Sequence, residues 1–458
     1  MIPILHFADS DDRRRIEGLL RRLRLDPMDL GIGKGENGTR EMTTVMGIVA
    51  DVAKRGDDAV VDQARKFDDP EFTVEQIQVT PQEMAAAAGR ITAEQKSAMK
   101  RSIDQLREYQ SAMMPKDPPP LKRPGVTLGM RFTPMDSAGL YFPGGKASYP
   151  SSLIHLAVPA QIAGVRHIAV CSPPSKYGRT DLVLAACHEL QLTNVYRMGG
   201  AAAIAALAFG TQSIPAVDKI VGPGNRWVQL AKRAVAGFVG IDGFLGPSEI
   251  LVLADSSANP KFIAADLIAQ AEHDPGSCFL LTTSEEIATR VQSEIDRQGR
   301  WLSRAVPLEK ALRECSAIIV GDSMDELVEL ANQFAAEHVN IQTKNEAQIL
   351  EQLRHAGAVF IGPYSPVAAG DYVAGPSHCL PTNTTARFTS GISVYEFLKR
   401  SSVAKYTAEG IAAEAPAIMT LAQSEGLDGH AASVRVRLPD TSAPNPADER
   451  MLDQLDPL

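Results

Sequence analysis

The spacing of apolar residues divides the chain into a helical amino-terminal part and a longer part in which strands and helices alternate. Apolar residues recur every three to four positions in 13–25, 45–67 and 92–113, which predicts amphipathic helices. The proline-rich stretch 114–125 ends this pattern. Beyond it, short β-rich apolar runs alternate with helix-like stretches, a pattern typical of parallel βαβ units.

The alternating part contains about seven apolar runs of strand length. The predicted strands are 167–171, 194–198, 218–222, 249–255, 278–283, 317–321 and 358–362. The predicted helices are 180–190, 200–209, 224–236, 258–273, 285–297 and 322–335. One sheet of this type needs fewer strands, so we expect an α/β fold of two doubly wound, Rossmann-like halves. A ligand would bind between them, beyond the carboxyl ends of the strands. After residue 385 the pattern is helical again, and 436–458 is typical of a polar, loose tail.

Composition and charge describe an ordinary globular protein. The chain has 458 residues, of which 44% are hydrophobic and 22% charged, enough for two or three domains. Its 46 basic and 55 acidic residues give a net charge of −9 without a basic block. This balance argues against nucleic acid and anionic membranes as partners.

Targeting and redox signals favour the cytoplasm. The amino terminus does not have the charge pattern of a secretory signal, and no apolar run approaches the length of a spanning helix. The five cysteines are scattered without a CxxC pair, which argues against a zinc ribbon and a disulfide framework. We therefore expect a soluble protein in a reducing compartment.

Three glycine-rich loops could contact a nucleotide. Residues 33–38 match GxGxxG, but a polar break precedes them instead of a buried strand, which predicts a flexible loop. The loops 139–152 and 221–227 each precede a helix and could offer backbone N–H groups to a phosphate, the first with Ser151 or Ser152 as N-cap. For each of these two, an ordinary tight turn is an equal alternative.

Gln270 and His273 lie three residues apart on one predicted helix, and therefore on one face. They could occupy adjacent positions of a metal site, or form a polar helix end where a histidine complements the helix dipole. From the residues alone the second reading is favoured. Asp371, His378 and His430 are further candidate ligands in glycine-punctuated loops, but spacing cannot join them.

Glu337 and His338 stand where a predicted helix meets an apolar run. Adjacent residues point in different directions from such a junction, so both could reach one site. A histidine suits proton removal from an alcohol, and a glutamate with a raised pKa could activate water. An ordinary pair at a helix end is the favoured alternative on physical grounds alone.

Nine separated motifs together resemble the histidinol dehydrogenase family. They are GLYFPGGKASYPSS, RMGGAAAIAALAFGT, VDKIVGPGN, GPSEILVLAD, LIAQAEHDP, FAAEHV, SPVAAGDYVAGPSHCLPT, RFTSGISVYEFLKRSSV and EGLDGHAASVRVRL. The resemblance runs from about residue 30 to 437. It implies a zinc- and NAD-dependent enzyme that oxidises L-histidinol through L-histidinaldehyde to L-histidine with two NAD⁺. It also implies an intertwined homodimer.

The resemblance implies a role for each matching residue. The implied ligands of one zinc ion per subunit are Gln270, His273, Asp371 and His430. The implied acid–base pair is Glu337 and His338, and both this histidine and the zinc ligands would also contact the substrate. Further implied substrate contacts are Ser248 and Glu425, and the implied NAD contacts are Tyr141 and Asn225.

We expect the chain to divide into four parts. Residues 1–34 would form an amino-terminal helical segment, and residues 35–140 plus 250–392 a first α/β domain with the zinc and catalytic residues. Residues 141–249 would form a second α/β domain with the NAD-binding loops. Residues 393–458 would form a helical segment that completes the partner subunit's site, so that the EGLxxH motif serves the other chain.

Two positions depart from the family pattern. Ala202 stands where a glutamine usually contacts NAD, which removes a side-chain hydrogen bond worth about 0.5–1.5 kcal/mol. His155 stands where an apolar residue is usual, and we expect it to be structural.

Three other functions remain open. A related zinc and NAD enzyme could oxidise another small alcohol, such as a sulfonated propanediol, although Ser248 and Glu425 favour histidinol. A thiol-dependent aldehyde dehydrogenase could use Cys379 beside His378 to form a thiohemiacetal. A non-enzymatic binding protein of similar fold would tolerate the loss of His338.

Overall fold

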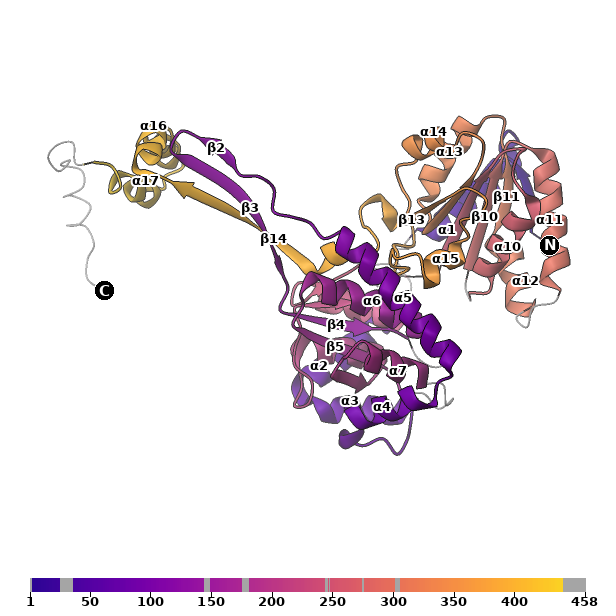
Figure 1. Cartoon of the computed structure of the whole chain (residues 1–458), viewed down its shortest axis with the longest axis horizontal. Helices are drawn as coiled ribbons and strands as arrows, with labels where there is room; N and C mark the ends of the chain where they lie inside the picture. Colours follow the sequence, from indigo (N-terminus) through magenta and orange to yellow (C-terminus); the bar gives the residue numbers. More distant parts are fainter. Residues whose placement is uncertain are drawn as a thin grey trace. The chain divides into compact units, whose positions relative to one another are not determined.

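The computed structural model of the chain contains two compact units (Figure 1). The first comprises residues 1–114 and 134–398, and the second comprises residues 115–133 and 399–458. The structure describes residues 2–24, 36–143, 149–174, 181–243, 246, 248–273, 276–300 and 305–439. The first unit contains two parallel sheets, each with its own helices.

A parallel sheet of six strands forms the centre of one half of the first unit. Its strands are β1 (Ile4–His6), β9 (Ser248–Ala254), β10 (Gly276–Thr282), β11 (Ala317–Val320), β12 (His338–Gln342) and β13 (Ala358–Ile361). They lie in the order β1-β11-β10-β9-β12-β13, and every neighbouring pair is parallel. Because the order reverses between β9 and β12, the sheet is doubly wound, as predicted.

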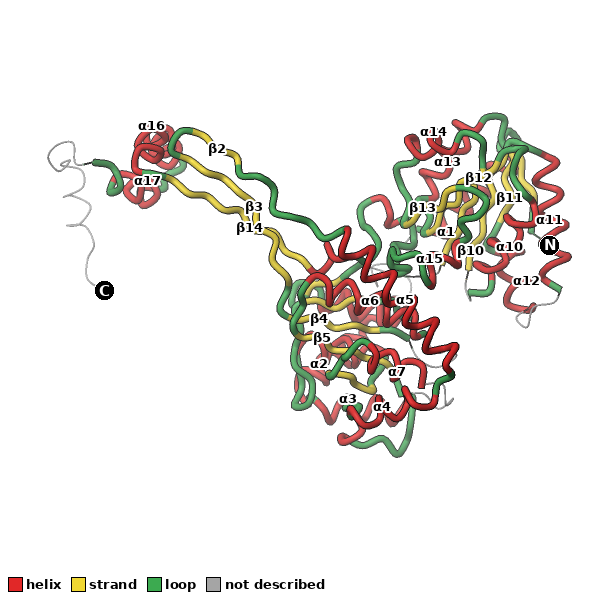
Figure 2. Tube along the Cα trace, viewed as in Figure 1, coloured by secondary structure: helices red, strands yellow, loops and turns green. Residues whose placement is uncertain are grey.

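Helices cover both faces of this sheet (Figure 2). On one face lie α10 (Pro260–Ala271), α11 (Glu285–Gly299), α12 (Ala305–Glu314) and α15 (Val367–Tyr372). On the other lie α1 (Ser10–Leu23), α13 (Met324–Phe334) and α14 (Glu346–Gln352). In β9, Ile250 and Val252 join the first layer, whereas Leu251 and Leu253 join the second. A strand covered on both faces needs such an unbroken apolar run because its side chains alternate between faces.

The other half of the first unit is built on five parallel strands in the order β6-β5-β4-β7-β8. They are β4 (Ser137–Tyr141), β5 (His167–Ser172), β6 (Asn194–Arg197), β7 (Lys219–Val221) and β8 (Gly240–Ile241). One face packs against α4 (Pro81–Arg90), α5 (Ala93–Ala112), α6 (Pro150–Ala163) and α7 (Asp181–Glu189). The other packs against α2 (Glu36–Arg55), α3 (Asp57–Phe67), α8 (Gly200–Phe209) and α9 (Arg226–Val235). This half is also doubly wound, since the order reverses between β4 and β7.

The second unit consists of a three-stranded sheet and two helices. Its strands are β2 (Leu121–Arg123), β3 (Val126–Pro134) and β14 (Leu398–Tyr406), in the order β14-β3-β2, and its helices are α16 (Ala408–Ser424) and α17 (Asp428–Arg435). Gly410 of α16 packs on Gly125, where an added Cβ would lie 2.2 Å from the Gly125 carbonyl oxygen. This contact therefore requires glycine at position 410.

The seven predicted strands and the helices between them are confirmed to within two residues at their ends. The pattern missed β1, β4 and β12. Strand β12 was hidden because His338 looked like a helix end. It also missed β14, which is largely exposed, and β3, most of whose residues are half-buried.

The observed packing differs from the expected domain boundaries. Within 1–34, β1 and α1 join the six-stranded sheet instead of forming a separate segment. Within 35–140, α2 to α5 and β4 belong to the five-stranded half and not with 250–392. The segment 393–458 contains β14 and is not purely helical. An amphipathic helix indicates that one face is buried, but its sequence does not name the sheet that buries it.

The loop predictions met different outcomes. Residues 33–35 of the GxGxxG match and residues 144–145 lie outside the described residues, as does 440–458 of the predicted tail. Helix α6 has Tyr149 as its N-cap residue, so neither Ser151 nor Ser152 caps it. Across the ranges that the structure describes, no helix is both long enough and apolar enough to span a bilayer.

Gly222, directly after β7, provides a test of the fold. Its φ is +117°, and a Cβ at this position would lie 1.8 Å from the carbonyl oxygen of Tyr141. We expect Gly222→Ala to lower the free energy of unfolding by at least about 3 kcal/mol, because it combines backbone strain with overlap. Urea denaturation measures this loss.

Gly18 is the matched control, because it lies inside α1 with nothing within 4 Å of an added Cβ. Gly18→Ala should raise the free energy of unfolding by about 0.5–1 kcal/mol through helix propensity. Equal effects of the two substitutions would contradict the packing described for Gly222.

Candidate active site

Glu337 and His338 lie at the amino-terminal edge of the six-stranded sheet. Helix α13 ends at Phe334, its C-cap residue Ala335 adopts the left-handed conformation with φ 46°, and the chain then enters β12 at His338. Strand β12 pairs with β9 so that His338 stands opposite Ile250. This register brings Ser248, the first residue of β9, beside the pair.

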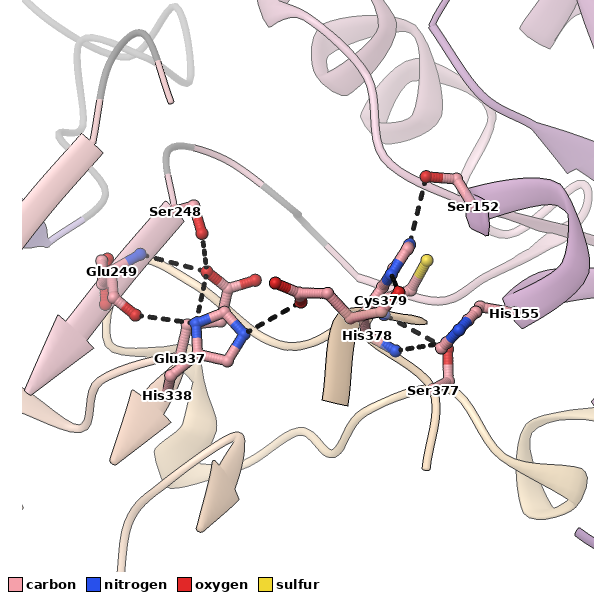
Figure 3. A network of polar contacts seen from close by, with 10 residues as sticks. Ser152, His155, Ser248, Glu249, Glu337, His338, Ser377, His378 and Cys379 are labelled. Carbon is pink, nitrogen blue, oxygen red and sulfur yellow. Dashed lines mark hydrogen bonds and ion pairs between the residues drawn. The ribbon is translucent and has the colours of Figure 1, made fainter. Parts of the chain in front are cut away.

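The carboxyl group of Glu337 is buried and held by neighbours on β9 (Figure 3). Its Oε2 atom accepts hydrogen bonds from the Ser248 hydroxyl and, at 3.0 Å, from the Glu249 backbone N–H. Burial raises the pKa of Glu337 to about 8, although these hydrogen bonds oppose the rise. A carboxyl group with this pKa can either hold or accept a proton near neutral pH.

The imidazole of His338 is buried with a defined tautomer. Its Nδ1 atom lies 3.0 Å from the Glu249 carbonyl oxygen, which can only accept, so Nδ1 carries the proton. Nε2 is then the basic nitrogen; it has no hydrogen-bond partner among the described residues and lies 4.0 Å from Asp371 Oδ1. Burial lowers the pKa of His338 while Asp371 raises it. Neutral His338 therefore presents a lone pair on the side of Asp371.

The predicted zinc ligands come from three elements of the chain. Gln270 is buried near the end of α10, and its Nε2 atom has no hydrogen-bond partner in the described part of the chain. His273 follows with its N–H bonded to the Gln270 carbonyl at 3.2 Å. Asp371 lies in α15, where burial raises its pKa. His430 lies on α17 of the second unit, where it is exposed.

These residues fit a zinc ion by their chemistry. The amide oxygen of Gln270, the imidazole of His273 and the carboxylate of Asp371 are oxygen and nitrogen ligands of the kinds that zinc accepts. Within the residues described, no three His, Cys, Asp or Glu side chains gather into a metal site. His430, the fourth implied ligand, belongs to the second unit.

Of the predicted NAD contacts, Tyr141 is the last residue of β4 and Asn225 lies beyond the carboxyl end of β7. The Tyr141 hydroxyl accepts the Gly200 N–H at 3.3 Å, and burial raises the Tyr141 pKa to about 12. Asn225 caps α9, since its Oδ1 accepts the Val228 N–H at 3.2 Å. The strand order reverses between β4 and β7, which is where nucleotides bind to doubly wound sheets. The six-stranded half differs, because Glu337 and His338 lie at the amino-terminal edge of its sheet.

A fully buried ion pair holds the loop before Asn225. Lys232 of α9 donates to Asp242 Oδ1 at 2.6 Å and to the Gly222 carbonyl oxygen at 2.5 Å, and Asp242 Oδ2 accepts the Gly222 N–H at 2.6 Å. Both charged side chains have an exposed fraction of 0%. The backbone N–H and carbonyl of Gly222 are thus both hydrogen-bonded to this ion pair.

Comparisons with known proteins agree on one family. Its sequence profile, described as histidinol dehydrogenase, matches residues 34–438. A histidinol dehydrogenase of Synechococcus sp. is 46% identical over 396 residues, which cover 86% of this chain and 91% of that protein. One of Caulobacter vibrioides is 41% identical over 434 residues, 94% of this chain and 98% of that protein. The chain belongs to the histidinol dehydrogenase family.

The fold agrees with membership of the histidinol dehydrogenase family. The crystal structure of histidinol dehydrogenase from Elizabethkingia anophelis superposes with a TM-score of 0.87 at 32% sequence identity, covering 95% of this chain and 98% of that one. The resemblance drawn from nine motifs is therefore confirmed. The roles of single residues stay predictions, as does the alternative of Cys379 as nucleophile.

The structure argues against that alternative. Cys379 is buried, and burial raises the pKa of its thiol. The neighbouring His378 does not bond to the thiol; its ring nitrogens meet Asp371 and Ser152. A neutral, enclosed thiol is a poor nucleophile, because the thiolate is the reactive form.

Sequence reasoning missed Glu249 as a member of this site. Its backbone contacts both Glu337 and His338, and its own buried carboxyl accepts the Asn383 N–H at 2.9 Å. Burial raises its pKa to about 8, and Glu337 adds to the rise. The sequence did contain a signal, because Glu249 opens the otherwise apolar run EILVLA, and a charged residue is rarely buried in such a run unless it has a partner.

Ala202, the position that departs from the family of histidinol dehydrogenases, lies near the start of α8 and is buried. A methyl group offers no hydrogen bond to a cofactor. Any support for NAD in this region therefore has to come from other groups of the chain.

The buried ion pair gives a prediction about stability. Lys232→Met leaves Asp242 buried without its cation and should lower the free energy of unfolding by about 3–5 kcal/mol. The double variant Lys232→Met/Asp242→Asn should lose less than the sum of the two single variants, because the pair is coupled. Urea denaturation of all four proteins completes the cycle.

An exposed ion pair serves as the comparison. Arg290 and Glu286 lie on the surface of α11, so Arg290→Met should change stability little. Strictly additive losses in the Lys232 and Asp242 cycle would contradict the coupling.

Proposed function

We propose that the chain oxidises L-histidinol through L-histidinaldehyde to L-histidine with two NAD⁺ and one zinc ion per subunit. Membership of the histidinol dehydrogenase family supports this activity. The observation that carries it is the buried pair of Glu337 and His338, with the basic Nε2 of the histidine facing Asp371. The relatives named above are all called histidinol dehydrogenase, which gives no support to a different small alcohol as the substrate.

His338 is the proton acceptor in this proposal. Its Nε2 takes the hydroxyl proton of histidinol while the carbon releases hydride to the first NAD⁺, so the alcohol becomes the aldehyde and NADH forms. The Glu249 carbonyl holds the Nδ1 proton at 3.0 Å and keeps the ring in the tautomer that this step needs.

Glu337 acts on the aldehyde. Its carboxylate takes a proton from water as the water oxygen adds to the aldehyde carbon. His338 returns the proton that it took from the alcohol to the former carbonyl oxygen, which completes the hydrate and leaves His338 neutral again. His338 then accepts a hydroxyl proton of the hydrate while a second hydride passes to the second NAD⁺, which leaves the carboxylic acid. Ser248 and the Glu249 N–H hold the Glu337 carboxyl in place for this step.

Gln270, His273 and Asp371 are the residues that would hold zinc, together with His430. When bound, the ion would polarise the hydroxyl oxygen of the amino alcohol as a Lewis acid. For NAD⁺, the proposed contacts are Tyr141 and Asn225, at the reversal point of the five-stranded sheet.

A homodimer belongs to the same proposal. Glu425 and His430 are exposed in the second unit, as expected of side chains that serve a partner subunit, and Glu425 would contact the substrate there. A reducing cytoplasm suits five free cysteines, and no nucleic acid or membrane partner is proposed.

The activity is tested by NADH formation with L-histidinol. We expect two NADH per histidinol, loss of turnover on treatment with a chelator, and recovery on return of zinc. Other vicinal amino alcohols and diols serve as comparison substrates. Absence of histidinol turnover would reject the proposed substrate, and turnover indifferent to chelation would reject the metal.

The shared site is tested by mixing inactive chains. His430→Ala and Glu337→Ala/His338→Ala homodimers should each be inactive, because each lacks one essential part of every site. Mixed dimers should regain up to about half of the activity per dimer, since one of the two sites then contains only intact residues. Mixed dimers that are shown by mass to be heterodimers and are nevertheless inactive would contradict the proposal that His430 serves the partner subunit.

A further inference from the structure

The segment from Asp371 to His378 is held by side chains of the five-stranded half. The Ser102 hydroxyl donates to the Tyr372 carbonyl oxygen at 2.6 Å, and the Gln110 amide donates to the Gly375 carbonyl oxygen at 3.3 Å. Gly375 has φ +107°, and an added Cβ would lie 2.6 Å from the Cβ of Tyr109. Helix α5 therefore holds the middle of this segment.

His155 of α6 holds the end of the same segment. Its side chain has an exposed fraction of 0%, and its Nδ1 atom accepts the His378 backbone N–H at 2.9 Å. The two imidazole rings stack with centroids 4.1 Å apart and planes 11° apart (Figure 3). One histidine thus fixes both the backbone and the ring of the other.

The ring of His378 is fixed at both nitrogens. Its Nδ1 atom lies 2.7 Å from the carbonyl oxygen of Asp371, which can only accept, so Nδ1 is the donor. Nε2 is then an acceptor, and the Ser152 hydroxyl donates to it at 3.1 Å. A chain of hydrogen bonds leads from α6 through His378 to the backbone of Asp371.

We propose that His155 is a positioning residue, which orients Asp371 for the metal through His378. An apolar side chain of similar size at position 155 would keep the packing of α6 but remove the acceptor for the His378 N–H. The ring of His378 could then rotate and release the Asp371 carbonyl. This inference rests on the proposed function, in which Asp371 is a zinc ligand.

Three substitutions separate the two contacts of His155. His155→Met removes both the acceptor and the ring, His155→Phe keeps a stacking ring without the acceptor, and His155→Asn keeps an acceptor near the place of Nδ1 without the stack. Zinc affinity is measured on the purified dimer by competition with a chromophoric chelator. Loss of an outer hydrogen bond to a metal ligand typically weakens metal binding about 10–100-fold, so we expect about tenfold for Met and Phe and a smaller loss for Asn.

Steady-state kinetics add a second readout. If Asp371 is misplaced, kcat should fall with the Met and Phe variants, while KM for NAD⁺ stays near that of the wild type. If His155 had a purely structural role, its variants would lower the melting temperature without a separate effect on kcat and KM, and His155→Asn would not restore zinc affinity.

Leu190→Ala is the matched control, because it removes a buried side chain from the same core without a polar contact to the segment. It should lower the melting temperature and leave zinc affinity unchanged. An equal loss of zinc affinity in Leu190→Ala, or wild-type affinity in both Met and Phe variants, overturns the positioning role. If the wild type itself binds no zinc and does not oxidise histidinol, the proposed function fails instead.

Discussion

The register between β9 and β12 is the constraint on which the candidate site depends. Because His338 stands opposite Ile250, the peptide groups of Glu249 lie at the end of the ladder, where they can bond to side chains. The N–H of Glu249 holds the carboxyl of Glu337, and its carbonyl fixes the tautomer of His338. A shift of the β9–β12 register by one residue would move every side chain of β12 to the opposite face of the sheet and break these hydrogen bonds.

Burial converts this geometry into chemistry. The pKa of Glu337 rises to about 8 because the charged form loses water, and the same loss lowers the pKa of His338. Two adjacent residues thereby acquire the opposite shifts that an acid–base pair near neutral pH needs. In the five-stranded half, Lys232 and Asp242 bond to both polar groups of Gly222 and so hold the irregular loop beyond β7.

Sequence reasoning predicted much of the fold and part of the site. The apolar runs that became β5, β9 and β10 were visible because strands covered on both faces carry unbroken apolar sequence. Strand β12 was not visible, because it opens with a histidine and contains two buried amides. Gln270 and His273 could be paired by helical spacing, but the residues alone favoured an ordinary helix end, and only the resemblance to a family changed that preference.

The sequence by itself determined the family, the two doubly wound sheets and the residue types on which the proposed oxidation rests, because these depend on periodicity and on motifs read along the chain. Only the tertiary structure decided which helices cover which sheet, that Glu249 holds both Glu337 and His338, and that His155 stacks on His378 beside Asp371. Each of these contacts joins residues far apart in the chain. Local propensity carries no information about such pairs, which form only when sheet register and helix packing bring them together.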